Sequence, residues 1–341
     1  MHRTKPGPPD DRPSVTRATL VVLLLLAGAA LGPTAGAAQA PRQATLVLAW
    51  SPQAQFAGHY VALEKGIYAR HGIDLAIVSG GPGVSPEDLL RDGTADFAVL
   101  WLSNALRQRS AGTPVVNLAQ VVQRSAMMLV ARRSSGIRTV ADMQGKKVGV
   151  WGGDLAIPPR ALFAQAGITV REVPLSMTVN LFLRGGIDVT SAMWYNEYHT
   201  ILASGLDPDE LTLVFLKDHG LRFPEDGLYA LERTVAADPA LAQAFILASR
   251  EGWAYAFEHV EETLDIVIRR MREAHLPANR VHQRWMLARM RELLMPADGQ
   301  PLLGRLDEGG YRAVGDVLRA QRLIRDFPRH EQFTWSGDAR R

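Results

Sequence analysis

Short apolar runs alternate with helical patterns along the chain from Thr45 onward. Residues 45–50 read as a strand, apolar side chains then recur at helical spacing up to Gly72, and residues 73–78 form the next apolar run. Gly72 suits the left-handed end of that helix, and Ser85-Pro86 suits the start of the helix before a third strand at 97–100. The alternation is typical of parallel strands covered by helices, so the sequence predicts an α/β fold.

The same order of features occurs twice. A glycine opens a strand, the next helix ends in Leu-Arg, and an aspartate opens a strand that ends near a tryptophan, first over 72–101 and again over 167–194. We therefore expect two similar α/β lobes. The alternative interpretation is that any two strand–helix–strand units look alike.

Changes of pattern suggest where each lobe begins and ends. We expect a signal peptide over 1–38, the first lobe over 44–131, the second lobe over 132–218, a helical return to the first lobe over 219–326, and a flexible tail over 327–341. In the return, helical patterns follow one another without a strand between them, and they are expected to cover the first lobe. They span 238–258, 260–274, 279–294 and 310–324.

The first forty residues have the order of an export signal. Four basic side chains precede the apolar run 20–31, and small residues follow through Ala40. The run is shorter than the ~20 residues that a membrane-spanning helix needs. We expect cleavage after Ala37 or Ala38 and a periplasmic protein, with a retained N-terminal anchor as the alternative.

Composition excludes several classes of function. The chain has no cysteine, which rules out disulfides, thiolate metal sites and a lipidated N-terminal cysteine. Its net charge of +3 lacks the strong basic excess typical of nucleic-acid binding, so no nucleic-acid partner is expected. The loop at 79–83 does not match the phosphate-binding pattern, and no catalytic or metal-ligating pattern stands out. We therefore expect neither an enzyme nor a cofactor or metal.

Candidate ligand-binding residues are sought after the strands, because open parallel sheets bind ligands outside the carboxyl ends of their strands. Five such segments stand out, at 50–56, 79–85, 101–104, 151–154 and 194–199, and four of them contain a tryptophan, which predicts a flat aromatic cage. The segments contain two acids and no Arg or Lys, and this favours a neutral or amine-bearing heterocycle over an anion. The candidates are Trp50, Gln53, Gln55, Phe56, His59, Gly80, Gly81, Trp101, Ser103, Trp151, Gly153, Asp154, Trp194, Tyr195, Asn196 and Glu197.

Several of these residues also have a purely structural interpretation. Each tryptophan could be half-buried packing. Asn196 and Glu197 could open a helix, where a first-turn acid favours the helix dipole. Asp154 could cap a turn, and a lone histidine such as His59 is more often structural than functional.

Four sequence segments resemble the NMT1/THI5-like (SsuA/THI5-like) family. They lie at 63–68, 71–75, 79–82 and 142–150, the last of which resembles the entry to the family's second lobe. The resemblance implies a type II periplasmic-binding-protein fold, with the chain crossing twice between two lobes and a small-molecule ligand in the cleft. It also implies delivery of that ligand to the permease subunits of an ABC importer, and we expect a monomer.

Within the family, Gln55, Phe56, His59 and the segment 194–198 are more similar to the thiamine-precursor branch than to the sulfonate branch. That similarity implies an aminopyrimidine-like ligand. The alternatives are a sulfonate- or nitrate-type anion held by backbone N–H groups, a pyrimidine synthase, and a sensor of ligand occupancy. The fungal synthases carry a cysteine-rich segment that this chain lacks, which argues against the synthase.

Overall fold

The computed structural model describes residues 1–4, 6–7, 40–295 and 302–337. Chain contacts separate Met1–Ala40 from the unit Pro41–Arg341, and the fold below is that of the second unit. The signal peptide expected over 1–38 lies almost entirely outside the described residues. Within the described ranges, no helix has both the length and the apolar character that a membrane crossing requires.

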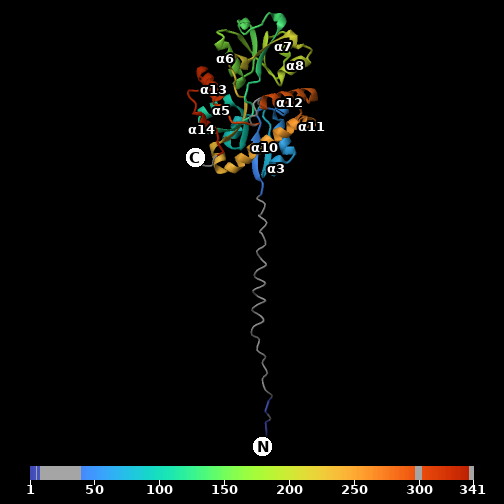
Figure 1. The fold of residues 1–341 in the computed structure, drawn as a ribbon, viewed down its shortest axis with the longest axis vertical. Helices are drawn as coiled ribbons and strands as arrows, with labels where there is room; N and C mark the ends of the chain where they lie inside the picture. Colours follow the sequence, from blue (N-terminus) through green and yellow to red (C-terminus); the bar gives the residue numbers. More distant parts are fainter. Residues whose placement is uncertain (5, 8–39, 296–301, 338–341) are drawn as a thin grey trace. The chain divides into compact units, whose positions relative to one another are not determined.

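Two five-stranded sheets form the two lobes (Figure 1). The first has the order β2(Ile73–Val78), β1(Arg42–Val47), β3(Phe97–Trp101), β10(Asp226–Leu231), β4(Val115–Gln120). The second has the order β7(Arg171–Pro174), β6(Lys147–Val150), β8(Val189–Met193), β5(Met127–Arg132), β9(Leu211–Phe215). In each sheet the central strands run parallel, and the fourth strand is antiparallel to both of its neighbours. The predicted pair of similar α/β lobes is therefore confirmed.

The aspartate of the repeat has the same role in both lobes. Asp96 accepts a hydrogen bond from the backbone N–H of Thr45 at 2.8 Å, and Asp188 accepts one from Lys147 at the same distance. Each carboxylate thus ties the start of one strand to the neighbouring central strand. The sequence likeness reflects a shared structural requirement of the two lobes.

The boundary between the lobes differs from the one expected. Residues 127–131 were assigned to the first lobe, but β5 pairs with β8 and β9 and so belongs to the second sheet. The chain also returns to the first sheet as β10, a strand that the prediction of an all-helical return missed. In each lobe, the antiparallel strand is the one that arrives directly from the other lobe.

Helices cover both sheets. They are α2(Ala57–Glu64), α3(Ile67–Arg70), α4(Pro86–Asp92), α5(Leu102–Ser110), α6(Ile157–Gln165), α7(Asn180–Leu183), α8(Glu197–Ala203), α9(Glu232–Ala237), α10(Pro239–Glu258), α11(Val260–Glu273), α12(Arg280–Leu294), α13(Glu308–Ala320) and α14(His330–Phe333). Ser85 and Asp238 cap α4 and α10 through their side chains, and a proline follows each of them, as the sequence predicts. The helix expected to run through to Gly72 instead breaks at Gly66, whose φ is 63°.

Two glycines allow α2 and α10 to pack closely in the first lobe. A Cβ atom at Gly58 would lie 2.3 Å from the Trp253 ring, and one at Gly252 would lie 2.3 Å from the Gly58 carbonyl oxygen. The Trp253 side chain is completely buried at this crossing. The close packing anchors α2, and with it the loop that follows β1.

The return helices do more than cover the first lobe. The Trp285 Nε1 of α12 donates to the Trp194 carbonyl at 3.1 Å, and the Gln321 side chain after α13 donates to the Ile157 carbonyl at 2.9 Å. In Figure 1, α12 and α13 lie on opposite sides, below α8 and α6 of the second lobe. The two lobes are therefore linked on both flanks as well as through the crossover segments.

The expected flexible tail is ordered through residue 337. Phe333 in α14 is completely buried, and the Trp335 N–H donates to the Asn117 carbonyl at 2.9 Å. The apolar side chains of the last helix therefore complete the core beside β4, and only residues 338–341 of that segment lie outside the described part of the chain.

Candidate ligand-binding site

Two neighbouring acids, Glu225 and Asp226, are buried where the chain crosses between the lobes. The two crossover segments are hydrogen-bonded to each other, since the N–H groups of Val121 and Val122 donate to the Asp226 carbonyl. The Gln120 side-chain amide also donates to the carbonyls of Glu225 and Asp226, at 3.1 and 2.9 Å. The Glu225 and Asp226 side chains are 1% and 2% exposed. This junction thus buries two carboxyl groups where the crossover segments meet.

One oxygen of Asp226 is held by the first lobe. Its Oδ2 accepts a hydrogen bond from Gln55 Nε2 at 2.7 Å. Burial raises the pKa of Asp226 to about 6, and the Gln55 and Trp101 side chains oppose that rise. Its buried Oδ1 has no hydrogen-bond partner among the described residues. Asp226 therefore keeps one acceptor available to a ligand.

Glu225 has a similar arrangement. Its Oε1 accepts from Ser125 Oγ at 2.9 Å and from the Ala126 N–H at 2.7 Å, while its buried Oε2 has no partner in the described part of the chain. Burial is the main reason that the pKa of Glu225 rises to about 8, and the negative charge of Asp226 adds to it. At neutral pH the pair thus carries about one charge rather than two.

Polar atoms without partners continue into α5. The Ser103 hydroxyl and the Asn104 Oδ1 are buried and lack hydrogen-bond partners among the residues described. Leu102, directly before them, donates its N–H to the Glu225 carbonyl. A buried polar atom left unpaired costs about 1–3 kcal/mol, so such a cluster indicates a site that is completed by a bound molecule.

Tyr195 supplies a phenol from the second lobe. The residue is 4% exposed, and burial raises its pKa well above the usual value. The charges of Glu225, Asp226 and Glu197 raise the pKa further, so the ring lies within electrostatic reach of the acid pair. The predicted residues Gln55, Trp101, Ser103 and Tyr195 are thus associated with one region.

Asn196 and Glu197 form a structural network instead. Glu197 is buried, and its two oxygens accept from the Met193 N–H at 2.9 Å and from Asn196 Nδ2 at 2.8 Å. The Asn196 Oδ1 is 2.8 Å from His282 Nε2 on α12. Both residues are fully engaged at the start of α8, which supports the structural interpretation of this pair.

Trp194 does not offer a free face for a cage. Its ring is stacked on Tyr198 with centroids 5.0 Å apart, and it contacts Phe215 and Trp285 edge-on. The Arg289 guanidinium lies 5.5 Å from its centroid. The expected cage of four indoles without a nearby guanidinium is therefore corrected at this position, because α12 covers Trp194.

Asp154 is paired across the lobes. Its Oδ1 is 3.0 Å from the Arg107 guanidinium of α5, so an acid expected to face a ligand is neutralised by a base from the opposite lobe. Gly153, next to it, has φ 63° at the start of the turn. Trp151, at the end of β6, is half-buried against the core. These residues lie at a contact between the lobes.

His59 and Phe56 belong to the core of the first lobe. His59 is 1% exposed, its Nδ1 is 3.0 Å from the Tyr68 hydroxyl, and its ring meets Trp253 edge-on. Burial lowers the pKa of His59 to about 3, so the ring is neutral. Phe56 is 1% exposed. Both are therefore left out of the candidate site.

The loop after β2 packs against the loop after β1. A Cβ atom at Gly80 would lie 2.3 Å from the Leu48 carbonyl oxygen, and one at Gly81 would lie 2.4 Å from Ser51 Oγ. Trp50, in the loop after β1, is 37% exposed. Gln53 lies nearby in the chain and donates to Gln55 Oε1 at 2.6 Å. Gln53 thereby orients the amide that holds Asp226.

Glu225 and Asp226 were missed by the sequence interpretation, which inspected only segments after strands. Both lie at the start of a strand rather than after one, and because β10 runs antiparallel to β3, its first residue Asp226 lies opposite Trp101 at the end of β3. The signal was present as two acids followed by Gly227 and the apolar run 228–231. Sequence alone did not reveal the strand direction.

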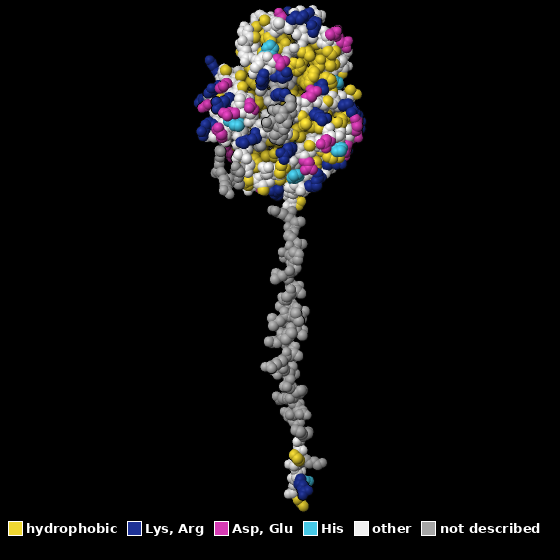
Figure 2. Space-filling model, in the orientation of Figure 1, with side chains coloured by type: hydrophobic (Ala, Val, Ile, Leu, Met, Phe, Trp, Pro, Cys, Tyr) yellow, Lys and Arg dark blue, Asp and Glu magenta, His cyan; other side chains and the backbone are white. Residues whose placement is uncertain are grey.

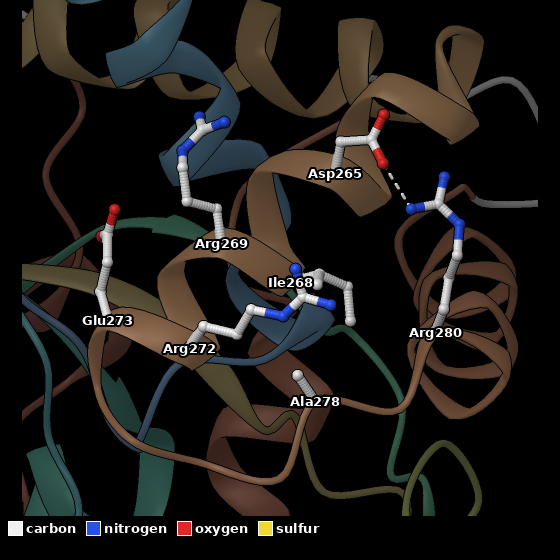
Figure 3. A pocket seen from close by; sticks show the side chains of 7 residues that line it. All are labelled: Asp265, Ile268, Arg269, Arg272, Glu273, Ala278 and Arg280. Carbon is white, nitrogen blue, oxygen red and sulfur yellow. Dashed lines mark hydrogen bonds and ion pairs between the residues drawn. The ribbon is translucent and has the colours of Figure 1, made fainter.

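Charged side chains elsewhere form surface features. Figure 2 shows basic and acidic groups interspersed on the face that it draws. A depression of about 500 Å³ lies beside α11, and Figure 3 shows the side chains that line it, among them Asp265, Ile268, Arg269, Arg272 and Arg280. Its Arg280 is already paired with Asp265 and Glu261. Opposite charges thus line this depression together, and it includes none of the junction residues described above.

Comparison with known proteins supports the resemblance noted in the sequence. A family model described as NMT1/THI5 like matches residues 53–263. The riboflavin-binding protein RibY of Chloroflexus aurantiacus is 26% identical, with 77% of this chain and 79% of that protein covered. The formylaminopyrimidine-binding protein of Halalkalibacterium halodurans is 27% identical, with coverage of 76% and 79%.

Two further similarities are to a relative that is named as an enzyme and to a protein of solved structure. The 4-amino-5-hydroxymethyl-2-methylpyrimidine phosphate synthase of Legionella pneumophila is 25% identical over 65% of this chain and 72% of its own. The periplasmic aliphatic sulphonate binding protein SsuA of Escherichia coli superposes with a TM-score of 0.68 at 18% identity, covering 87% of this chain and 93% of that one. The expected two-lobed periplasmic-binding-protein fold is thereby confirmed.

Proposed function

Because the chain belongs to the NMT1/THI5 like family, we propose that it is the solute-binding component of an ABC importer and holds a small heteroaromatic molecule between its lobes. The observation that carries this proposal is the cluster of buried polar atoms without described partners at the crossover junction, on Ser103, Asn104, Glu225 and Asp226. Native structures pair the large majority of their buried polar groups, so unpartnered atoms on these residues support a bound molecule as their partner.

The fold suits reversible capture. The lobes are joined by two short crossovers and linked by side-chain contacts on both flanks, which is the arrangement of a hinge with a closed state. Exchange of a few contacts would open the lobes while each sheet stays intact. The proposed partners are the ligand and the membrane subunits of a permease, and the proposed location is the periplasm, with the chain acting as a monomer.

An aminopyrimidine-like molecule is the favoured ligand. One relative is named for binding formylaminopyrimidine, and the junction combines the Trp101 indole, the Tyr195 phenol and carboxyl groups. Aromatic stacking is worth about 1–3 kcal/mol per face, so a ring with a few polar contacts reaches micromolar affinity. The sulphonate-binding neighbour keeps a small anion as the second candidate.

Synthase chemistry is the alternative from a different class. One relative is named as a pyrimidine phosphate synthase. Lys65, the lysine nearest the first loop, ends α2 on the surface, where it pairs with Glu262 at 2.8 Å. That position does not support a covalent cofactor on this side chain.

The test is ligand titration of the mature protein, followed by native mass spectrometry of the complex. The probes are 4-amino-5-hydroxymethyl-2-methylpyrimidine, riboflavin and taurine, with tryptophan fluorescence as the readout. We expect saturable binding of the aminopyrimidine and its release with unchanged mass. Binding of taurine alone would establish the anion candidate, and a changed ligand mass would indicate an enzyme.

A further inference from the structure

We propose that Glu225 and Asp226 are the hydrogen-bonding partners of the ligand and restrict it to amino-substituted nitrogen heterocycles, neutral or cationic, with anions rejected. The inference deepens the proposed function and rests on it, since it names the residues that choose the ligand class.

In both acids, one carboxyl oxygen is bonded to protein groups and the other has no described partner. Asp226 Oδ2 is fixed by Gln55, and Glu225 Oε1 is fixed by Ser125 and the Ala126 N–H. The second oxygen of each is buried and has no partner within the described ranges. Glu197, in contrast, is a buried acid with both oxygens engaged. Of these three acids, Glu197 uses both oxygens within the described structure, while Glu225 and Asp226 each keep one oxygen without a described partner.

A second observation points to the same region. Ser103 is 4% exposed, and its hydroxyl has no hydrogen-bond partner among the residues that the structure describes. Leu102, the preceding residue, is bonded through its N–H to the Glu225 carbonyl. A serine hydroxyl both donates and accepts, so it complements ring nitrogens and amino groups equally well. The acid pair is thus accompanied by a neutral polar group that also requires a partner.

The protonation of the pair matches an aminopyrimidine edge. Burial raises the pKa of Glu225 to about 8 and that of Asp226 to about 6, so near neutral pH Glu225 is mostly protonated and Asp226 mostly ionised. A protonated carboxyl donates its free O–H to a ring nitrogen, while the carboxylate accepts an N–H from the amino group. A sulfonate would instead meet the Asp226 charge in a buried setting, which is unfavourable.

The experiment compares two isosteric variants, Glu225→Gln and Asp226→Asn, with Glu197→Gln as the matched control. Each is titrated by calorimetry with 4-amino-5-hydroxymethyl-2-methylpyrimidine, with the same pyrimidine bearing an oxo group at position 4, and with taurine. Thermal unfolding of each variant verifies that it is folded. Using the oxo probe on the wild-type protein tests the same claim without any mutation.

We expect Asp226→Asn to weaken aminopyrimidine binding about tenfold or more, as loss of a hydrogen bond to a charged carboxylate does, while Glu225→Gln, whose amide keeps a donor in place of the protonated carboxyl, should weaken it less. Glu197→Gln should retain the wild-type affinity, and the wild-type protein should discriminate against the oxo probe about tenfold or more. Wild-type affinity in both acid variants, or equal binding of the amino and oxo probes, would overturn the inference alone. Failure of the wild-type protein to bind either pyrimidine would overturn the proposed function, and the inference with it.

Discussion

His199 on α8 and His282 on α12 place their Nδ1 atoms 2.9 Å apart, one from each lobe. The Asn196 Nδ2 donates to Glu197, so its Oδ1 faces His282 Nε2, which must therefore carry the proton. His282 Nδ1 is then the acceptor of the His199 Nδ1–H. A single chain of hydrogen bonds thus runs from Glu197 through Asn196 and His282 to His199, and it requires the His282 imidazole to be neutral.

Acid should weaken this contact between the lobes. Burial, with a contribution from His199, lowers the pKa of His282 to about 4, and burial lowers that of His199. A histidine whose pKa is lowered on folding contributes stability that is present above the unfolded value of about 6.5 and is lost as the pH falls toward 4. We expect a loss of about 1 kcal/mol after allowance for solvent, measured as a decrease of Tm between pH 7 and pH 4.

The variant His282→Gln should remove most of the loss of stability between pH 7 and pH 4, because an amide does not titrate. Asn196, Glu197 and Trp285 surround the pair, and among these only Glu197 titrates; burial raises its pKa. His71→Gln, at a surface pair with Glu251, serves as the control. A variant profile parallel to that of the wild-type protein would disprove the role of the pair.

At alkaline pH, the dependence of folding stability on pH should be set by Glu225. An acid whose pKa is raised on folding, here to about 8, contributes stability that is present below the unfolded value near 4.5 and is lost as the pH rises through 8. In the ligand-free protein, Glu225→Gln should therefore raise stability at pH 9 by about 2 kcal/mol and change it little at pH 5. Denaturant unfolding at the two pH values measures this, with Glu251→Gln as a surface control. Equal effects at both pH values would show that Glu225 titrates normally.

The ion pair between Arg107 and Asp154 should contribute to closure. It is 3.0 Å long and joins α5 of the first lobe to the turn after β6 of the second. Such partly exposed pairs are worth about 0.2–1 kcal/mol, so Asp154→Asn should weaken ligand binding about two- to fivefold, with a smaller difference at high salt.

Glu172→Gln is the matched control for that measurement, because Glu172 binds Arg160 within the second lobe. Titration of both variants at low and high salt separates a contact between lobes from one inside a lobe. An equal loss of affinity in the two variants would mean that the Arg107 pair has no special part in closure.

Glu197→Gln should lower stability rather than affinity. The substitution puts a donor beside Asn196 Nδ2 and disrupts the bonds that end at His282, at a cost of about 1–2 kcal/mol. Thermal unfolding should show the decrease, and ligand affinity should stay within about twofold of wild type. The reverse pattern, weaker binding at unchanged Tm, would restore Glu197 as a ligand-binding residue.

Much of the fold could be predicted from local patterns. The strand over 73–78 has the predicted bounds, the helix that begins at Pro239 ends at Glu258 as expected, and the caps at Ser85 and Asp238 form. Caps, turns and periodicity involve residues close together in the chain, so their signals survive in a single sequence. The two-lobe organisation was likewise visible in the repeated order of glycine, helix and aspartate.

The site depended on contacts between distant residues. Gln55 and Asp226 lie 171 positions apart, and their hydrogen bond follows from β10 entering the first sheet antiparallel beside β3. Strand direction also decided that Asp226, at the start of its strand, would face the edge where β3 ends. The sequence by itself determined most of the elements, the paired lobes and the family resemblance, because these are written in local spacing, although it missed β10 and the break at Gly66. Only the tertiary structure decided which acids keep a free oxygen and which are already bonded, because hydrogen-bond satisfaction depends on neighbours that the chain brings together from afar.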